Sequence, residues 1–131
     1  MRREFKLPPE DEDYLVNSGL EWETVRDGGS GRVIIHGFPI PEGYNVRTAS
    51  INVRIDGVYP ESQLDMVYIY PPLSLVKGTS IGALSSDQFD GKTWQRWSRH
   101  RTPQQPWRPG IDDLSMHLEL VKDWLARELK K

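Results

Sequence analysis

The sequence of 131 residues contains no cysteine. Disulfide bonds, thiolate metal ligands, cysteine nucleophiles and thioester intermediates are therefore excluded without any structural assumption. The sequence also lacks an apolar run long enough to span a bilayer or to form a signal-peptide core after its Met-Arg-Arg start, so we expect a cytoplasmic protein with no membrane partner. The three histidines, His36, His100 and His117, do not have the spacing of a metal site, and we expect neither a metal ion nor a cofactor.

A strong net charge is absent as well. The chain has 17 basic and 19 acidic residues and a formal net charge of −2, which provides no overall field for nucleic acid. Its length predicts one domain over residues 1–131, long enough to bury a core, and the aromatic fraction of 10% indicates that a core forms.

Helix signals occur near both ends of the chain. Leu7-Pro8-Pro9 and the acidic residues after it suit the first turn of a helix, and Gly19 is a natural stop. A longer helix is predicted from about Asp112 to Leu129, with Asp112 or Asp113 as its cap. Its apolar residues recur at helical spacing: Leu114, Leu118, Val121, Leu125 and Leu129.

Between these helices, β-prone segments alternate with turn residues. Four strands are predicted: Glu21–Val25, Arg32–Gly37, Val46–Ile55 and Leu64–Tyr70. In the third strand, the alternate residues that include Ala49, Ile51 and Val53 share one face, and we expect this face to meet the core. We therefore expect an α+β fold in which a four-stranded antiparallel meander is covered on one face by the N-terminal and C-terminal helices. The other face is wet or binds a partner, and residues 73–88 are left without an assigned element.

Residues 89–113 form the most unusual stretch of the sequence. They hold three of the five tryptophans, Trp94, Trp97 and Trp107. Between Gly91 and Gly110 every formal charge is positive, from Lys92, Arg96, Arg99, Arg101 and Arg108, with His100 among them. Three prolines prevent regular helix over much of this stretch, and we expect a long irregular segment, which in a small domain is usually functional or a binding loop. Because Trp and Arg are the usual anchors of interfaces, we predict a partner-binding surface; in the alternative interpretation the tryptophans fill the core and the arginine stems cover it.

The order of these segments resembles the ubiquitin-conjugating (UBC/RWD) fold. Tyr59-Pro60, the following strand and Pro71-Pro72 are similar to the Tyr-Pro, strand and proline turn of that fold. Asp90-Gly91 resembles the active-site segment in which family members place Asn-Gly and then the cysteine. Trp107-Arg108-Pro109 is similar to the Trp-Ser-Pro that opens the helix after the active site.

Three further segments resemble a bacterial branch, the prokaryotic ubiquitin-conjugating-like "family E". They are Leu7-Pro8-Pro9, the segment Pro41–Asn45 and the segment Trp94–His100. Members of this branch occur in operons with ubiquitin-like proteins, activating-enzyme homologues and deubiquitinase-like peptidases. The resemblance therefore implies a ubiquitin-like protein, its activating enzyme or both as partners.

The sequence departs from the family at the position that carries the chemistry. Counted from Gly91, the cysteine position falls on Trp94, a degenerate active-site position, and no histidine precedes it closely. A conjugating enzyme carries its modifier as a thioester, which an indole cannot form. Ser98 or Lys92 is a conceivable acceptor, but an oxyester or an amide transfers poorly.

We therefore expect a non-catalytic binding or adaptor protein of a bacterial ubiquitin-like modification system. Either the open face of the sheet or the loop Trp94–Arg108 would supply its binding surface. The candidate partner-binding residues are Trp94, Arg96, Trp97, Arg99, His100 and Arg101. An exposed edge strand near Trp22 could support self-association.

Two other functions fit parts of the sequence. An atypical enzyme of the same pathway could use His100 as a general base beside Ser98 or Asp90, while the arginines hold a carboxylate. Arginines interleaved with aromatic residues could also bind single-stranded nucleic acid. The net charge and the acidic N-terminal run argue against this last function.

Overall fold

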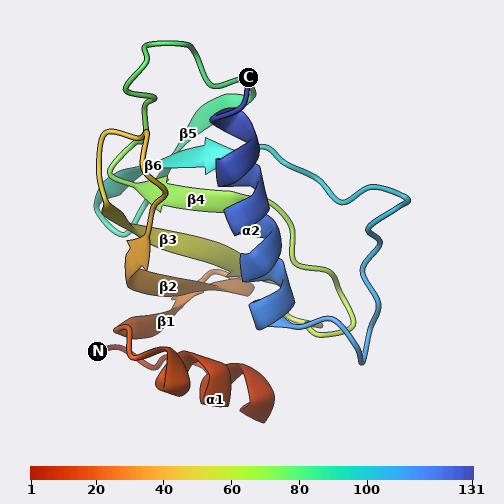
Figure 1. Cartoon of the computed structure of the whole chain (residues 1–131). Helices are drawn as coiled ribbons and strands as arrows, with labels where there is room; N and C mark the ends of the chain where they lie inside the picture. Colours follow the sequence, from red (N-terminus) through yellow and green to blue (C-terminus); the bar gives the residue numbers. More distant parts are fainter.

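The computed structural model describes all residues from 1 to 131, and its helices and strands form one sheet with a helix on one face (Figure 1). In chain order the elements are α1 (Pro9–Ser18), β1 (Trp22–Asp27), β2 (Ser30–Pro39), β3 (Thr48–Ile55), β4 (Val67–Tyr70), β5 (Leu84–Phe89), β6 (Lys92–Trp97) and α2 (Leu114–Glu128). The strands are all antiparallel to their neighbours, in the spatial order β1-β2-β3-β4-β6-β5. The predicted α+β class and the four-strand meander are confirmed, but the sheet has six strands.

Both predicted helices form, and their ends follow the capping residues. Gly19 ends α1 in the left-handed conformation with φ 74°, and its N–H donates to the carbonyl of Val16. Asp113 caps α2 by accepting from the backbone N–H of Met116 at 3.1 Å. The cap residues therefore positioned both helices within a residue or two of their predicted ends.

The main core lies between the sheet and α2. Ile51 and Val53 of β3 are fully buried on this face, as their parity predicts, and meet Leu118 and Leu125 of α2 in one hydrophobic cluster. Each such side chain contributes about 1.5–3 kcal/mol by leaving water. Neither helix is long and apolar enough to cross a membrane.

A hairpin occupies the end of residues 73–88, which the sequence left without an assigned element, and the first part of the predicted irregular segment. Its strands β5 and β6 are joined by Asp90 and Gly91, whose φ angles are 55° and 72°. Two successive positive φ values are typical of the tight turn that suits a hairpin, and Asp-Gly is a preferred pair for it. β6 pairs with β4, and β5 lies outside it at the edge of the sheet. The prediction of an irregular segment from residue 89 was therefore wrong as far as Trp97.

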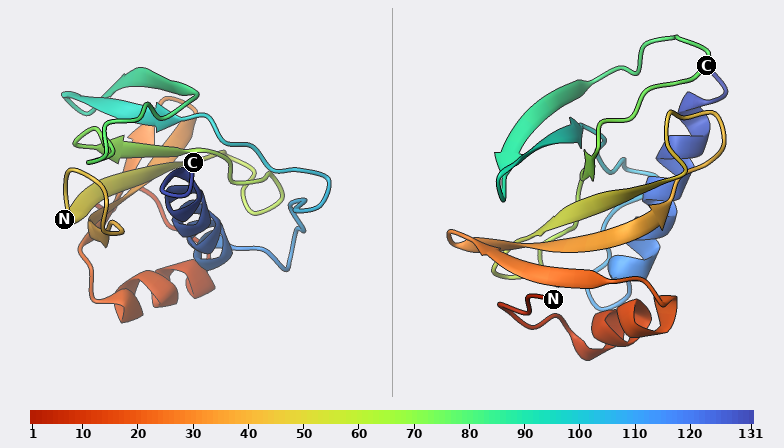
Figure 2. Two further views of the ribbon diagram at one scale, coloured as in Figure 1. Left: turned by 45° about the horizontal axis from the view of Figure 1, so that its top comes forward. Right: turned by 90° about the vertical axis from the view of Figure 1, so that its left-hand side faces the viewer.

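The two edges of the sheet differ. The β1 edge is covered by the N-terminal residues, because Glu4 N–H donates to the carbonyl of Thr24 at 2.9 Å and Thr24 N–H donates to the carbonyl of Arg2 at 3.1 Å. The prediction of an exposed edge near Trp22 was therefore wrong. In the right-hand view of Figure 2, β5 is the outer boundary of the sheet on the side away from α1.

The sheet face opposite α2, which we call the open face, has a small core of its own. Val25, Ile34, Tyr68 and Trp94 are buried together there. Arg32, which is 4% exposed, lies between the rings of Tyr68 and Phe89, with its guanidinium carbon 4.5 and 4.6 Å from their centroids. This face is therefore not simply wet, because stacked aromatic and charged side chains cover its centre.

Candidate functional site

The irregular part of the basic stretch is the segment 98–113, which we call the arch. It leaves the end of β6, projects beyond the sheet and returns to the start of α2 (Figure 1). Its prolines lie within this segment, so its backbone cannot join the sheet as β6 does. A long irregular segment held on a rigid scaffold is a common place for a binding site.

Buried contacts fix the arch at its middle and its far end. The Arg101 guanidinium donates from Nε to the carbonyl of Leu64 at 2.8 Å and from Nη2 to Nδ1 of His117 at 2.9 Å. Trp107 donates from its indole N–H to the carbonyl of Pro60 at 2.9 Å. Within the arch itself, the guanidinium of Arg108 pairs with Asp112 at 2.9 Å. The arch is therefore tied to the rest of the fold at several separate points.

His117 is a fixed acceptor inside this network. It is fully buried, and burial lowers its pKa to about 4, so the ring is neutral at neutral pH. Its Nε2–H donates to the carbonyl of Met66 at 2.9 Å, which leaves Nδ1 to accept from Arg101. Burial also lowers the pKa of Arg101. His117 and Arg101 therefore fix the position of the arch relative to α2, and the assignment of Arg101 as a partner-binding residue stays a prediction.

Two ion pairs lie at the near end of the arch. The Arg99 guanidinium contacts the nearly buried carboxylate of Glu128 at 2.9 Å. Burial opposes the charge on Glu128, but hydrogen bonds from Lys131 and Arg99 outweigh it and lower the pKa of this carboxyl. His100 Nδ1 lies 2.7 Å from a carboxylate oxygen of Asp65, and the His100 side chain is 66% exposed. The His100 side chain is therefore far more exposed than the Arg99 and Glu128 side chains, which are 17% and 3% exposed.

A groove runs between the arch and the outer side of α2. It has a volume of about 770 Å³, and its lining includes Gln105, Pro106, Met116, Leu120 and Arg127. A second hollow of about 290 Å³ adjoins it and shares Gln105 and Arg127, with Arg99 and His100 on its wall. We call the two together the α2 groove. Its lining is mostly polar and charged, and Met116 and Leu120 are the hydrophobic side chains of the larger hollow, which suits a polypeptide better than a small apolar ligand.

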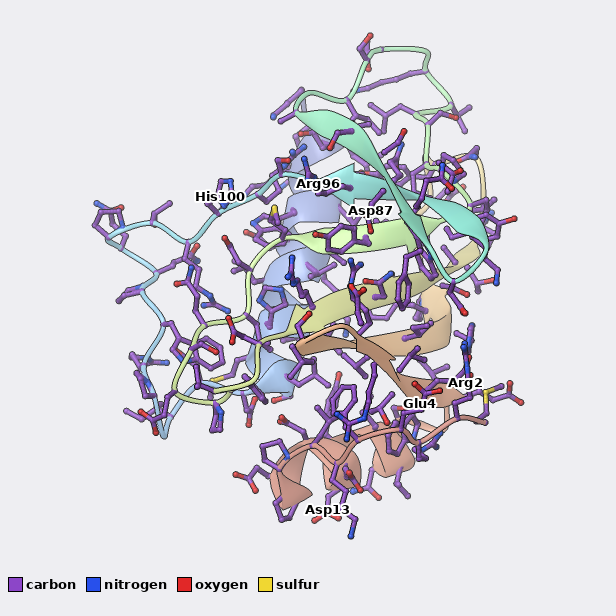
Figure 3. All side chains as sticks on the ribbon, turned by 180° about the vertical axis from the view of Figure 1, so that it is seen from behind. Arg2, Glu4, Asp13, Asp87, Arg96 and His100 are labelled. Carbon is purple, nitrogen blue, oxygen red and sulfur yellow. The ribbon has the colours of Figure 1, made fainter.

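The structure separates the predicted site residues into two groups. Arg99, His100 and Arg101 meet beside α2, as their clustering in the sequence predicts. Arg96 lies on the open face instead, where its Nε donates to Oγ of Ser85 at 2.9 Å. Figure 3 shows the separation, with His100 on the arch and Arg96 on β6 beside Asp87.

Trp94 and Trp97 are interior residues. They are 1% and 0% exposed, so in this conformation neither side chain is available to a partner, and the interpretation in which tryptophans fill the interior fits both. Trp97 belongs to the main core, whereas Trp94 belongs to the cluster on the open face. Trp94 therefore lies on the sheet face opposite α2. Its assignment as the degenerate active-site position stays a prediction.

Sequence reasoning missed the residues that α2 contributes to the groove. Met116 is 44% exposed, and Arg127 pairs with Asp123 at 2.8 Å on the outer side of the helix. The signal was present, because Met116 and Leu120 lie outside the apolar stripe that predicts the core face. Only the position of the arch over that side of α2 makes them part of a groove.

A row of polar side chains on the open face was also missed. His36 Nδ1 lies 2.8 Å from Oγ of Ser50, and His36 Nε2 lies 2.7 Å from Glu23. Glu23 in turn accepts from Nε of Arg2 at 2.8 Å, and Arg2 also pairs with Asp90 at the β5–β6 turn. Hydrogen bonding to Arg2 lowers the pKa of Glu23 to about 2. The row joins the N-terminal residues to three strands and to the hairpin turn.

Comparison with known proteins finds one family that matches most of the chain. The family model described as Prokaryotic E2 family E matches residues 7–128. No curated protein and no solved structure matches. The matched region contains both helices, the whole sheet and the arch.

Proposed function

The chain belongs to prokaryotic E2 family E, and on this premise we propose that it is a non-catalytic binding protein of a bacterial ubiquitin-like modification system. Its partner would be a ubiquitin-like protein or the enzyme that activates one. The family match supports the pathway, and the intact, well-packed fold supports a protein that is maintained for binding. Transfer of a modifier through a thioester is excluded by composition alone.

The observation that carries this proposal is the absence of cysteine from a chain that keeps the family fold. A thioester needs a thiolate that attacks the activated carboxyl and later leaves. At the position counted from Gly91 the chain has Trp94, whose indole is buried and donates to the carbonyl of Phe89 at 3.0 Å. This side chain has a packing role and no nucleophilic atom.

The α2 groove is the surface that we assign to the partner. It is lined by residues from the arch and from α2, and Arg101 links the two by donating a hydrogen bond to His117 of α2. A preformed surface of this kind loses little conformational entropy when a partner binds. Its exposed Met116 and Arg127 are residue types enriched at interfaces.

The experiment is a calorimetric titration of the purified protein with the ubiquitin-like protein and the activating enzyme encoded by the adjacent genes. Arg127→Glu reverses an exposed charge in the groove, and we expect it to weaken binding by about tenfold or more. Arg54→Glu is the matched control, because Arg54 is an exposed arginine on the open face.

Three results decide the proposal. Loss of affinity in Arg127→Glu alone supports the groove. Loss in Arg54→Glu alone transfers the binding site to the open face. Absence of binding by the unchanged protein to either partner contradicts the proposed function.

A second candidate function rests on the pair formed by His100 and Asp65. Asp65 accepts from one ring nitrogen of His100 at 2.7 Å and leaves the other to the solvent, which is the arrangement of a general base oriented by a carboxylate. An atypical enzyme could use this pair, with Arg99 or Arg101 to hold the carboxylate of a modifier. The test is the modifier's fate after incubation with this protein: a conversion that His100→Ala and Asp65→Asn both abolish supports the enzyme, and an unchanged modifier removes it.

A further inference from the structure

The outer edge of β5 carries backbone groups that the chain does not use. The N–H of Ser98 donates to the carbonyl of Ala83 at 3.1 Å, which marks these two residues as a bonded pair of the hairpin. Bonded and non-bonded pairs alternate along an antiparallel ladder, so Ser85, Asp87 and Phe89 also bond to β6. The N–H and C=O groups of Leu84, Ser86 and Gln88 then point away from β6, toward the solvent.

β5 lacks the proline, lysine and bulge that often protect an edge strand. Its six residues are Leu-Ser-Ser-Asp-Gln-Phe. The opposite edge of the sheet is protected by the N-terminal residues, which bond to Thr24 of β1. One edge of the sheet is therefore closed and the other is open.

We propose that β5 pairs antiparallel with β5 of a second copy of this chain, about a two-fold axis at Ser86. In this register Ser86 of the two copies forms a bonded pair, and Leu84 pairs with Gln88 of the partner subunit. Ser85 then lies opposite Asp87 of the partner subunit at a non-bonded site, where side chains are closest. A shift that paired Ser86 with Gln88 of the partner subunit would place the two Asp87 carboxylates opposite each other, which is unfavourable.

Charge complementarity supports both the partner and the register. Arg96 makes no ion pair within the chain, and its Nε donates to Oγ of Ser85 at 2.9 Å. The carboxylate opposite Ser85, from Asp87 of the partner subunit, would therefore lie beside the Arg96 guanidinium. Asp87 already contacts Arg32 at 3.2 Å and keeps 28% of its side chain exposed, so it can serve both arginines. The two-fold axis forms this ion pair twice.

The assembly would extend the sheet without changing its faces. A two-fold axis perpendicular to the sheet leaves both α2 helices on one side and joins the two open faces on the other. A contact limited to one edge strand of each copy is small, so we expect a weak dimer that forms at high protein concentration.

Cysteine cross-linking tests the register directly, because the chain has no cysteine of its own. In Ser86→Cys the two cysteines would have Cα atoms roughly 5.5 Å apart, which a disulfide can span. In Gln88→Cys, the matched control on the same strand and the same side, the two positions are offset by four residues, roughly 13 Å. We expect mild oxidation to cross-link Ser86→Cys about tenfold faster than Gln88→Cys. Equal rates in the two variants overturn the register.

Sedimentation of the unchanged protein and of charge variants tests the ion pair. We expect a concentration-dependent dimer that Arg96→Glu weakens by about tenfold or more, because the introduced carboxylate would face Asp87 of the partner subunit. Adding Asp87→Asn to Arg96→Glu removes this repulsion and should restore part of the association. A protein that stays monomeric up to millimolar concentration, or that dimerises equally in Arg96→Glu, overturns the proposal. Neither experiment includes a ubiquitin-like partner, so its failure leaves the proposed function untouched.

Discussion

β6 and the arch are adjacent segments with the same kinds of residue and opposite structures. Both are basic and both contain tryptophan. In β6 the tryptophans are buried on the two faces of the sheet, whereas the arch projects into solvent and presents His100 and Arg108. The difference lies in the backbone: the prolines begin at Pro103, after β6 has paired with β4 and β5. Aromatic and basic content therefore did not decide exposure, and the capacity to form a ladder did.

The largest difference in stability between variants of the two segments should come from their tryptophans. Trp97→Ala removes a fully buried ring that lies 6.4 Å from Tyr44, and we expect it to lower the free energy of unfolding by about 3–5 kcal/mol. Trp107→Ala removes a half-buried ring of the arch and one hydrogen bond, with an expected loss of about 1–2 kcal/mol. Urea denaturation of both variants measures the difference. Equal losses would mean that the arch is as much a part of the core as β6.

An intermediate effect should be a pH dependence of stability that comes from His117, the residue of α2 that accepts a hydrogen bond from Arg101 of the arch. His117 has a folded-state pKa of about 4, below the ordinary value of about 6.5, so the unfolded chain binds more protons between these values. The contribution of neutral His117 to the free energy of unfolding is complete above pH 6.5. It is lost as the pH falls toward 4, and the free energy of unfolding falls by roughly 3 kcal/mol at most.

Urea denaturation at several pH values tests this dependence. His117→Gln, which does not titrate, should flatten it between pH 6.5 and 5, where the depressed pKa of Glu23 on the open face has no effect yet. An unchanged slope in this variant would assign the titration to another group.

The smallest effect should distinguish the arginines of the two segments. Arg101→Ala leaves the carbonyl of Leu64 and Nδ1 of His117 without their donor, and we expect a loss of about 1–3 kcal/mol. Arg96→Ala removes one exposed hydrogen bond to Ser85 on β5, and we expect a change within about 0.5 kcal/mol. Thermal unfolding of the two variants gives the comparison. A larger loss from Arg96 would mean that the charged open face stabilises the fold more than the arch contacts do.

The sequence predicted the elements whose signals are local. The helix stop at Gly19, a cap at Asp112 or Asp113 and the alternating parity of Ile51 and Val53 all depend on residues within a few positions, and all were confirmed, with Asp113 as the cap. The β5–β6 hairpin was missed although Asp90-Gly91 is a strong hairpin signal. The density of tryptophan and arginine around it was interpreted as a loop, and β5 itself has a polar sequence with little β preference.

The candidate site was predictable only in part. Clustering along the chain brought Arg99, His100 and Arg101 together, and the structure keeps them beside α2. The position of residues along the chain could not show that Arg96 and Trp94 lie on the opposite face of the sheet. A strand sends alternate side chains to opposite faces, so the face of each residue became known only with strand β6. Position along the chain also could not show Met116 and Arg127 as neighbours of the arch, since the contact joins segments that are distant in sequence.

The residue sequence alone determined that this member of its family forms no thioester, because no arrangement of 131 residues without cysteine can supply a thiolate. It also determined the two helices and the four-strand meander, because caps, turns and apolar periodicity act over short distances. Only the tertiary structure decided which of the basic residues face a groove, which edge of the sheet stays open and which tryptophans are hidden. These properties depend on how β6 pairs and where the arch returns, and pairing between distant segments is not encoded in any single stretch of the chain.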